Sequence, residues 1–346
     1  MNQPQVPPQV RIWQLGLGFA NTAVLHALVG TGVIEQMRQQ PQSLSGLTQA
    51  CQLNPDMLYR ALRFATVIGV VEQNDSQYSL TETGTLLLKD VPGSVYMGIL
   101  LIGSEPWQRG WQNFVHSLAT GDAAFDQAMG DPFFEYLDKH PEYGQPFNEW
   151  QTILTAMAAR AINEAYDFSA FETICDVGGG QGVLLKSILS ANSHLRGILY
   201  DQESVVKDHV LAGLSQRVEI QSGNFFERVP TAETLIMKNV LHDWNDEKCQ
   251  IILSRCRQAM QPSSRLLIVE MIIDSPADLM GVFYDMHMQV ILGGKERTES
   301  EFSALLQKAD MKLNRIIPTK SPMKIIEVSI IGPKNWTSSE DGKTVY

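Results

Sequence analysis

The feature that most constrains the fold is a short apolar run that leads directly into a cluster of glycines. The run is Thr173–Val177, the sequence GGGQG follows at 178–182, and a helix-like stretch comes next. Glycine permits positive φ and lets a ligand approach the backbone closely, while the N-terminus of a helix presents free N–H groups. We therefore predict a strand, a ligand-binding loop and a helix in this order.

Short apolar runs alternate with helix-like stretches from this point onward. Such alternation predicts an α/β fold with a doubly wound, mostly parallel sheet, whose ligands bind beyond the carboxyl ends of the strands. The expected strands are Thr173–Val177, Gly197–Tyr200, Val218–Ser222, Thr234–Lys238, Arg265–Glu270 and Ile325–Ile331. The expected helices are Gly182–Ser190, Gln202–Ala212, Asp246–Met260 and Ser300–Ala309.

The first part of the chain has a different pattern, with helix-like segments over Ile12–Ile68 and then a hairpin pattern over Val70–Leu80. Helix, turn, helix and hairpin is the order of a winged-helix module. Such a module either binds DNA or serves as a scaffold. The wing carries Glu72 and Asp75 but no Lys or Arg to meet phosphates, which favours the scaffold.

Composition disfavours several classes of function. The 27 Lys and Arg residues against 38 Asp and Glu residues give a net charge of −11, which disfavours a nucleic-acid surface. We find neither about 18 uninterrupted apolar residues nor a secretory signal, so we expect a soluble protein with no membrane partner. The 4 cysteines show no CxxC spacing, so we expect free thiols, a cytoplasmic location and no metal site.

Polar and aromatic residues follow three of the expected strands. Asp201 could bond both hydroxyls of a ribose, or it could cap the helix expected from Gln202. Asn224 and Phe225 offer a polar side chain and a flat apolar one for an adenine ring. His242 follows the strand 234–238 in the same crevice, and its ordinary pKa of about 6.5 suits it to accept a proton at neutral pH.

Five ordered motifs resemble the S-adenosylmethionine-dependent O-methyltransferases of the plant phenolic type, such as caffeic acid and isoflavone O-methyltransferases, and their bacterial natural-product relatives. The motifs are DVGGGQG at 176–182, GNFF at 223–226, KNVLHDWND at 238–246, Val269-Glu270 and GGKERT at 293–298. The resemblance implies a Rossmann-like methyltransferase domain, S-adenosylmethionine as cofactor and no metal. It also implies methyl transfer to a hydroxyl, phenolic in character, of a small aromatic secondary metabolite.

The resemblance also implies roles for single residues. The cofactor-binding residues would be Gly178, Gly180, Asp201, Asn224, Phe225, Lys238 and Trp244. The general base would be His242, with Glu270 and Glu296 on either side to orient the imidazole and stabilise its charged form. Taken alone, Glu270 could instead pair with a nearby base, and Glu296 with Lys295 or Arg297.

The sequence departs from the family at Asn224, where Asp is usual. Asn keeps an acceptor for an adenine amino group but loses the charge, so we expect weaker cofactor binding. The candidates for a substrate pocket are Phe147, Trp150, His287 and Met288. The sequence leaves open whether these residues face a substrate or belong to a core or a dimer interface.

Four segments follow from the length of 346 residues and from the resemblance. We expect a winged-helix-like dimerisation domain at 1–110 that forms a homodimer, and a helical linker at 111–165 that contributes to the substrate pocket. The cofactor-binding domain would span 166–334, and 335–346 would be a flexible tail. Two other functions stay open: a relative with altered chemistry (N-methylation, or cofactor-assisted decarboxylation or hydroxylation), and a DNA-binding regulator that senses a ligand.

Overall fold

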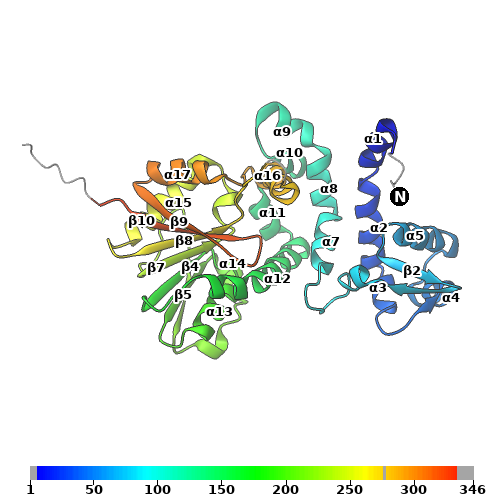
Figure 1. The fold of residues 1–346 in the computed structure, drawn as a ribbon, viewed down its shortest axis with the longest axis horizontal. Helices are drawn as coiled ribbons and strands as arrows, with labels where there is room; N and C mark the ends of the chain where they lie inside the picture. The colour runs from blue at the N-terminus through cyan, green and yellow to red at the C-terminus, as the bar shows by residue number, and fades with distance from the viewer. Residues whose placement is uncertain (1–5, 276–277, 333–346) are drawn as a thin grey trace, which may run out of the picture. The chain divides into compact units, whose positions relative to one another are not determined.

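A computed structural model describes residues 6–275 and 278–332, which divide into two compact units (Figure 1). The first unit contains the chain up to Met157 together with Met286–Gly293, and the second contains Ala158–Asp285 and the chain from Gly294. The expected tail at 335–346 lies outside the described residues. The other domain limits expected from the sequence remain predictions.

Helices build most of the first unit. They are α1 (Pro8–Gly16), α2 (Phe19–Gly30), α3 (Val33–Gln36), α4 (Leu44–Cys51), α5 (Pro55–Val67), α6 (Glu82–Thr85), α7 (Tyr96–Ile102), α8 (Glu105–Gln112), α9 (Phe114–Thr120), α10 (Ala124–Met129), α11 (Phe133–Lys139) and the start of α12 (Pro141–Ala165). Ser43 and Asn54 cap α4 and α5 by accepting backbone N–H bonds. The hairpin is confirmed as β2 (Val71–Asn74) and β3 (Gln77–Leu80), and β1 (Gln42–Ser43) extends it to a small sheet.

A seven-stranded sheet forms the centre of the second unit, in the order β6-β5-β4-β7-β8-β10-β9. Its strands are β4 (Thr173–Val177), β5 (Arg196–Asp201), β6 (Val218–Ser222), β7 (Thr234–Lys238), β8 (Arg265–Glu270), β9 (Met311–Pro318) and β10 (Lys324–Ile330). The first five are parallel, whereas β10 runs antiparallel to β8 and β9. The predicted doubly wound, mostly parallel sheet is therefore confirmed, and its strand order reverses next to β4.

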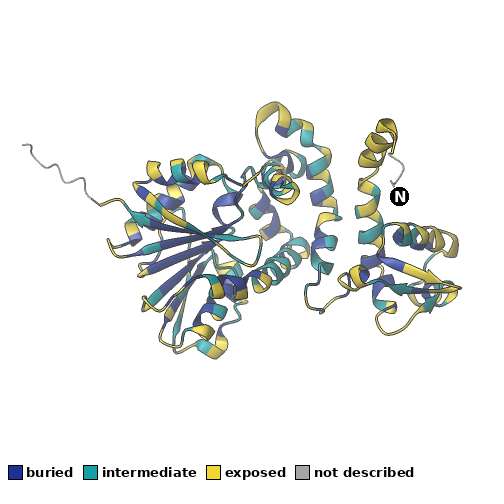
Figure 2. Ribbon diagram, viewed as in Figure 1, coloured by how far each residue is buried: buried dark blue, intermediate teal, exposed yellow. Residues whose placement is uncertain are grey.

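Helices cover this sheet and complete the second unit. They are the rest of α12, then α13 (Val183–Ala191), α14 (Glu203–Val206), the short turns η1 (Ala212–Leu214) and η2 (Leu241–Asp243), α15 (Asp246–Ala259), the start of α16 (Leu279–Leu292) and α17 (Glu299–Lys308). All five residues of β7 are buried, as are the last five of β8, which explains why both strands read as continuous apolar runs (Figure 2).

One expected element was wrong, and two elements of the structure were not predicted. The helix expected over Gln202–Ala212 is reduced to α14, which has 4 residues. The edge strand β9 was not predicted, because 4 of its 8 residues are exposed and polar residues interrupt its apolar pattern. The apolar helix α16 was not predicted either.

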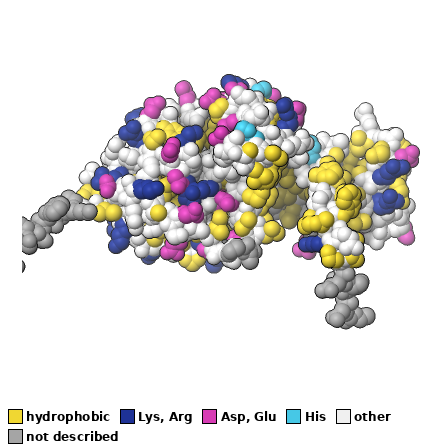
Figure 3. Space-filling model, turned by 90° about the horizontal axis from the view of Figure 1, so that it is seen from above, with side chains coloured by type: hydrophobic (Ala, Val, Ile, Leu, Met, Phe, Trp, Pro, Cys, Tyr) yellow, Lys and Arg dark blue, Asp and Glu magenta, His cyan; other side chains and the backbone are white. Residues whose placement is uncertain are grey.

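The surface of α1 and α2 is unusually apolar. Ile12, Trp13 and Phe19 are 70%, 69% and 69% exposed, and Figure 3 shows hydrophobic side chains gathered on this part of the molecule. Among the described residues, one stretch, Pro8–Gly30, is long and apolar enough to cross a membrane by length and composition alone. That is weak evidence for a membrane span, because helices of soluble proteins meet the same criterion. The cytoplasmic location remains a prediction.

Candidate active site

Three glycines of the loop between β4 and α13 have left-handed backbone conformations. Their φ angles are 67° at Gly178, 60° at Gly180 and 82° at Gly182. A Cβ atom at Gly178 would lie 2.8 Å from Val240 Cγ2, whereas a Cβ atom at Gly180 would meet nothing within 4 Å. The loop therefore needs glycine for its conformation, and it leaves free space for a ligand at Gly180.

Asp201, at the end of β5, braces this loop. Its Oδ2 accepts a hydrogen bond from the Gly180 N–H at 2.8 Å, and its Oδ1 accepts one from the Gln202 N–H at 2.7 Å. Burial raises the pKa of Asp201, although both N–H groups favour the ionised form. The N-cap of α14 is Gln202, so Asp201 does not cap this helix, and a role at a ribose remains a prediction.

Asn224 and Phe225 lie in the turn that follows β6. Asn224 Oδ1 accepts the Phe226 N–H at 2.9 Å, so the amide oxygen helps to form the turn. The Phe225 ring lies beside the glycine loop, because a Cβ atom at Gly178 would be 3.6 Å from Phe225 Cε1. Trp244 meets Phe225 and Phe226 edge to face, with ring centroids 6.3 and 4.9 Å apart. These rings form an apolar wall next to the loop.

Two buried groups of opposite charge, Asp176 and Lys238, lie near the ends of β4 and β7. Asp176 is 1% exposed, and among the described residues its Oδ2 has no hydrogen-bond partner. Burial raises the pKa of Asp176 to about 7 and lowers the pKa of Lys238 to about 8. An unpaired buried acceptor beside a glycine loop suits a donor group of a ligand. Sequence reasoning gave Asp176 no role, although it begins the glycine motif.

His242 lies in the turn η2, directly after β7, and is 8% exposed. Its Nδ1 is 2.7 Å from Glu296 Oε1, and its Nε2 is 3.3 Å from Asp243 Oδ1. The imidazole thus bridges two carboxylates. The structure brings together His242 and Glu296 as expected, whereas Lys295 and Arg297 pair with Asp246.

Glu270, at the end of β8, binds the backbone of the turn. Its Oε1 accepts the N–H groups of Val240, Leu241 and His242 at 3.2, 2.7 and 3.2 Å. Its Oε2 has no hydrogen-bond partner within the described part of the chain. Sequence reasoning placed Glu270 beside the imidazole, but its hydrogen bonds go to the backbone. It influences the ring through its charge.

The ionisation of His242 differs from the sequence-based expectation. Burial by itself lowers the pKa of His242, but the charges of Glu296 and Asp243 outweigh burial and raise it to about 10. Burial also raises the pKa of Asp243, to about 7. The ring of His242 is therefore a charged imidazolium at pH 7, with a proton on each nitrogen. Nε2 must lose its proton before it can accept one from a substrate.

The four candidates for a substrate pocket, Phe147, Trp150, His287 and Met288, all belong to the first unit. Trp150 packs closely on Gly98, since a Cβ atom there would be 2.8 Å from Trp150 Cζ2. His287 Nδ1 accepts the Trp111 Nε1–H at 3.2 Å. Phe147 packs against other rings, and Met288 is buried. All four have packing contacts, and contact with a substrate remains a prediction for each.

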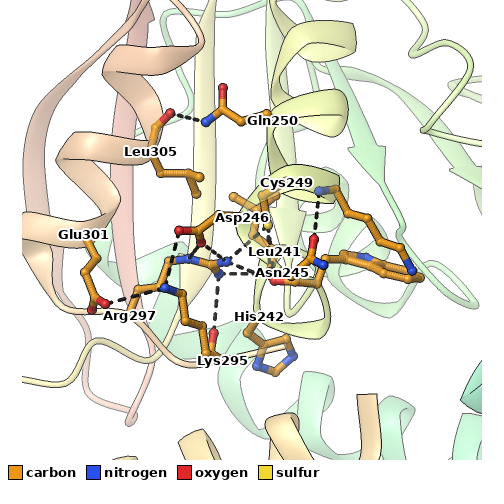
Figure 4. A network of polar contacts seen from close by, with 12 residues as sticks. Leu241, His242, Asn245, Asp246, Cys249, Gln250, Lys295, Arg297, Glu301 and Leu305 are labelled. Carbon is orange, nitrogen blue, oxygen red and sulfur yellow. Dashed lines mark hydrogen bonds and ion pairs between the residues drawn. The ribbon is translucent and has the colours of Figure 1, made fainter. Parts of the chain in front are cut away.

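The segment after α16 packs against the His242 turn. A Cβ atom at Gly294 would lie 2.0 Å from the His242 carbonyl oxygen, and the Lys295 N–H donates to the same oxygen at 2.9 Å. Arg297 is 1% exposed and binds this turn as well (Figure 4). Sequence reasoning treated Arg297 only as a partner for Glu296, and the available signal was its position directly after Glu296 in the GGKERT motif.

Two family models match the chain. One, described as the O-methyltransferase domain, matches residues 111–312, and the other, the O-methyltransferase dimerisation domain, matches residues 13–90. Together they cover both the region that carries the glycine loop and His242 and the region that contains the hairpin.

Relatives match over nearly the whole chain. Phenazine O-methyltransferase PhzM of Lysobacter antibioticus is 35% identical over 329 residues, which cover 93% of this chain and 96% of the relative. The structure of the mitomycin 7-O-methyltransferase MmcR has a TM-score of 0.89 at 32% identity and covers 93% of this chain and 97% of that one. The O-methyltransferase NcsB1, in complex with S-adenosylmethionine and 2-hydroxy-5-methyl naphthoic acid, has a TM-score of 0.80 at 26% identity and covers 90% and 96%.

Proposed function

Since the chain belongs to the O-methyltransferase family and is an S-adenosylmethionine-dependent O-methyltransferase of secondary metabolism, we propose that His242 removes the proton of its substrate hydroxyl. The observation that carries this proposal is the buried imidazole between Glu296 and Asp243. Of the functions left open by the sequence, the comparisons favour O-methylation over altered chemistry and DNA binding.

The residues near the glycine loop fit S-adenosylmethionine. The free space at Gly180 admits the amino acid end of the cofactor, and the unpaired Asp176 Oδ2 offers it an acceptor. We assign the ribose to Asp201, the adenine to Asn224 and Phe225, and further contacts to residues on the neighbouring strand ends. These further residues are Gly178, Lys238 and Trp244. In the described ranges, no group of three or more His, Cys, Asp or Glu residues could hold a metal ion.

When bound, S-adenosylmethionine supplies a methyl group on a positively charged sulfur that leaves as a neutral thioether. The substrate supplies the attacking oxygen, and the chain must make it nucleophilic, because a phenolate is a far better nucleophile than a phenol. His242 Nε2 accepts the hydroxyl proton as the new oxygen–carbon bond forms, and Glu296 at Nδ1 stabilises the resulting imidazolium. Removing Asp243 from Nε2 would lower the pKa of His242, so we propose that the substrate hydroxyl takes its place.

We propose a small aromatic hydroxyl compound as the substrate. The relatives named for phenazine and mitomycin, and the naphthoic acid bound to NcsB1, support this class. Phe147, Trp150, His287 and Met288 are our candidates for its contacts. A phenol with an ordinary pKa of about 10 suits a base whose charged form is stabilised by Glu296, because that stabilisation helps Nε2 to take the hydroxyl proton.

We further propose that a second copy of this chain covers the apolar surface of α1 and α2. The match to a dimerisation domain at 13–90 and the exposure of Ile12, Trp13 and Phe19 support a homodimer. Light scattering after size exclusion measures this state directly. A monomer at micromolar concentration would contradict the proposal.

The catalytic proposal is tested with His242→Ala in a screen of phenolic acceptors with isotope-labelled S-adenosylmethionine, in which methylated products are read by mass. We expect kcat to fall by about 10²- to 10⁴-fold, the usual value of general-base assistance. Affinity for S-adenosylhomocysteine should stay within about threefold, because the glycine loop does not depend on His242. Wild-type kcat should rise with pH as His242 loses its proton, and this rise should be absent from the variant.

A further inference from the structure

We infer that Arg297 is a positioning residue, which holds both the turn that carries His242 and the Glu296 that orients its imidazole. The inference rests on the proposed function of His242 as the general base. It deepens that proposal, since nothing in the base assignment itself requires a buried arginine.

Arg297 donates hydrogen bonds to carbonyls on both sides of His242. Its Nη1 bonds Leu241 O at 3.0 Å, and its Nη2 bonds Trp244 O at 2.9 Å. The rigid fork of the guanidinium fixes the distance between these two carbonyls, so the backbone of the turn has little freedom between them. Figure 4 shows the guanidinium among the residues of this turn.

A half-exposed carboxylate, Asp246, fixes the guanidinium itself. Asp246 Oδ1 lies 2.9 Å from Arg297 Nη2 and 3.2 Å from Nε. The side chain of Arg297 is 0% exposed and that of Asp246 is 48% exposed. Because Asp246 is the first residue of α15, the pair connects the buried turn to the start of this helix. A buried cation with a nearby carboxylate and carbonyl partners on two sides is well satisfied.

Glu270 and Arg297 act on opposite groups of the same turn. Glu270 accepts the N–H groups of residues 240–242, and Arg297 donates to the carbonyls of residues 241 and 244. Glu296 is the neighbour of Arg297 in the chain and bonds His242 Nδ1 at 2.7 Å. Arg297 therefore fixes the backbone that carries the imidazole and also the chain segment that carries its partner. A small shift of either would misplace Nε2 relative to a substrate oxygen.

The test is Arg297→Lys, with Arg217→Lys as a matched control. Arg217 likewise donates to backbone carbonyls, those of Leu189, Asn192 and Leu195, but at the opposite end of α13 from the glycine loop. Lysine keeps the charge in both variants but cannot reproduce the fork. Both variants should therefore lose some thermal stability, and only Arg297→Lys should affect His242.

Five quantities separate positioning from general stability. They are the thermal midpoint, the affinity for S-adenosylhomocysteine, kcat and KM for a phenolic acceptor, and the proton NMR signal of the His242 Nδ1–H, identified by its loss in Glu296→Gln. We expect both Lys variants to shift the midpoint by a few degrees and to retain cofactor affinity. Arg297→Lys alone should move the His242 signal and lower kcat by about 10- to 100-fold, with KM changed less than about threefold.

If Arg297→Lys matches Arg217→Lys in kcat and leaves the His242 signal in place, the inference is wrong. A displaced signal with unchanged kcat would keep the positioning role but refute the base assignment, so the two proposals fail separately. If Arg297→Lys does not fold, Asp246→Asn is compared with Arg217→Lys in its place. Asp246→Asn removes the charge that fixes the guanidinium and leaves the contacts of Arg297 to the carbonyls in place. It should change the signal and kcat in the same direction by a smaller factor.

Discussion

The glycine loop and the His242 turn both follow strands of the same sheet, yet they are built in opposite ways. The loop after β4 has three glycines at positive φ and leaves free space around Gly180, where a Cβ atom would meet nothing within 4 Å. The Asp201 carboxylate and the Tyr200 carbonyl accept N–H groups of this loop. The turn after β7 has its backbone groups bound by buried charged side chains, Glu270 and Arg297. One region leaves room for a ligand beside its main chain, whereas the other holds one side chain in place.

This difference predicts that the two regions can be damaged separately. Variants of the turn should change turnover while cofactor affinity stays nearly constant, and variants of the loop should do the reverse. A residue that affected both quantities strongly would show that the loop and the turn are coupled through the ends of β4 and β7.

After His242→Ala, the largest effect expected from the turn is that of Glu270→Gln. The amide keeps a carbonyl oxygen for the N–H groups of residues 240–242 but loses the charge, and hydrogen bonds to charged groups are about twice as strong as neutral ones. We expect kcat to fall by about 10- to 100-fold, because a loosened turn misplaces the base. Stopped-time assays at saturating cofactor measure kcat, and calorimetry with S-adenosylhomocysteine should give a dissociation constant within about threefold of wild type. Weaker cofactor binding together with a normal kcat would contradict our assignment of Glu270 to the His242 turn.

A smaller effect, of the opposite kind, is expected from Asp201→Asn. The amide weakens the bond from Gly180 N–H and loses the charged acceptor offered to a ribose, so the dissociation constant for S-adenosylmethionine should rise about tenfold. At saturating cofactor, kcat should stay within about twofold of wild type, because His242 is not touched. An unchanged dissociation constant by calorimetry would remove Asp201 from the cofactor site.

The smallest effect is expected from Asn224→Asp. Asn224 Oδ1 accepts the Phe226 N–H, and a carboxylate can form the same turn while adding a charged acceptor for an adenine amino group. Cofactor affinity should therefore stay equal or improve by up to about threefold. A clear loss of affinity would show that the Asn224 amide group donates a hydrogen bond that Asp cannot replace.

The two regions also differ in how well the sequence predicts them. The glycine loop was predicted because its signal is local, with strand, glycines and helix adjacent in the chain. The environment of His242 was predicted only through the family resemblance, since its partners Glu270 and Glu296 lie 28 and 54 residues further along. The hydrogen bonds of Glu270 to the backbone, the contact of Asp243 with Nε2 and the clamp by Arg297 depend on tertiary packing, and no local pattern carries them.

The fold was predicted where burial produces a continuous apolar run, as in β7 and β8. The prediction failed where exposure removes that run. The edge strand β9 carries exposed Lys312 and Arg315, so its alternation was not recognised, although β10 beside it was. The resemblance implied that Glu270 and Glu296 stabilise the charged form of His242, but it gave no pKa value, and the contact of Asp243 with Nε2 was not predicted.

The most direct test of the account compares two acceptors in wild type and His242→Ala. One acceptor is a phenol with an ordinary pKa of about 10, and the other is an acidic phenol of similar shape that is already ionised at the assay pH. If His242 removes the hydroxyl proton, the variant should lose about 10²- to 10⁴-fold in kcat with the first acceptor and less than about tenfold with the second. An equal loss with both acceptors would contradict the account, because His242 would then act on the site without accepting the proton.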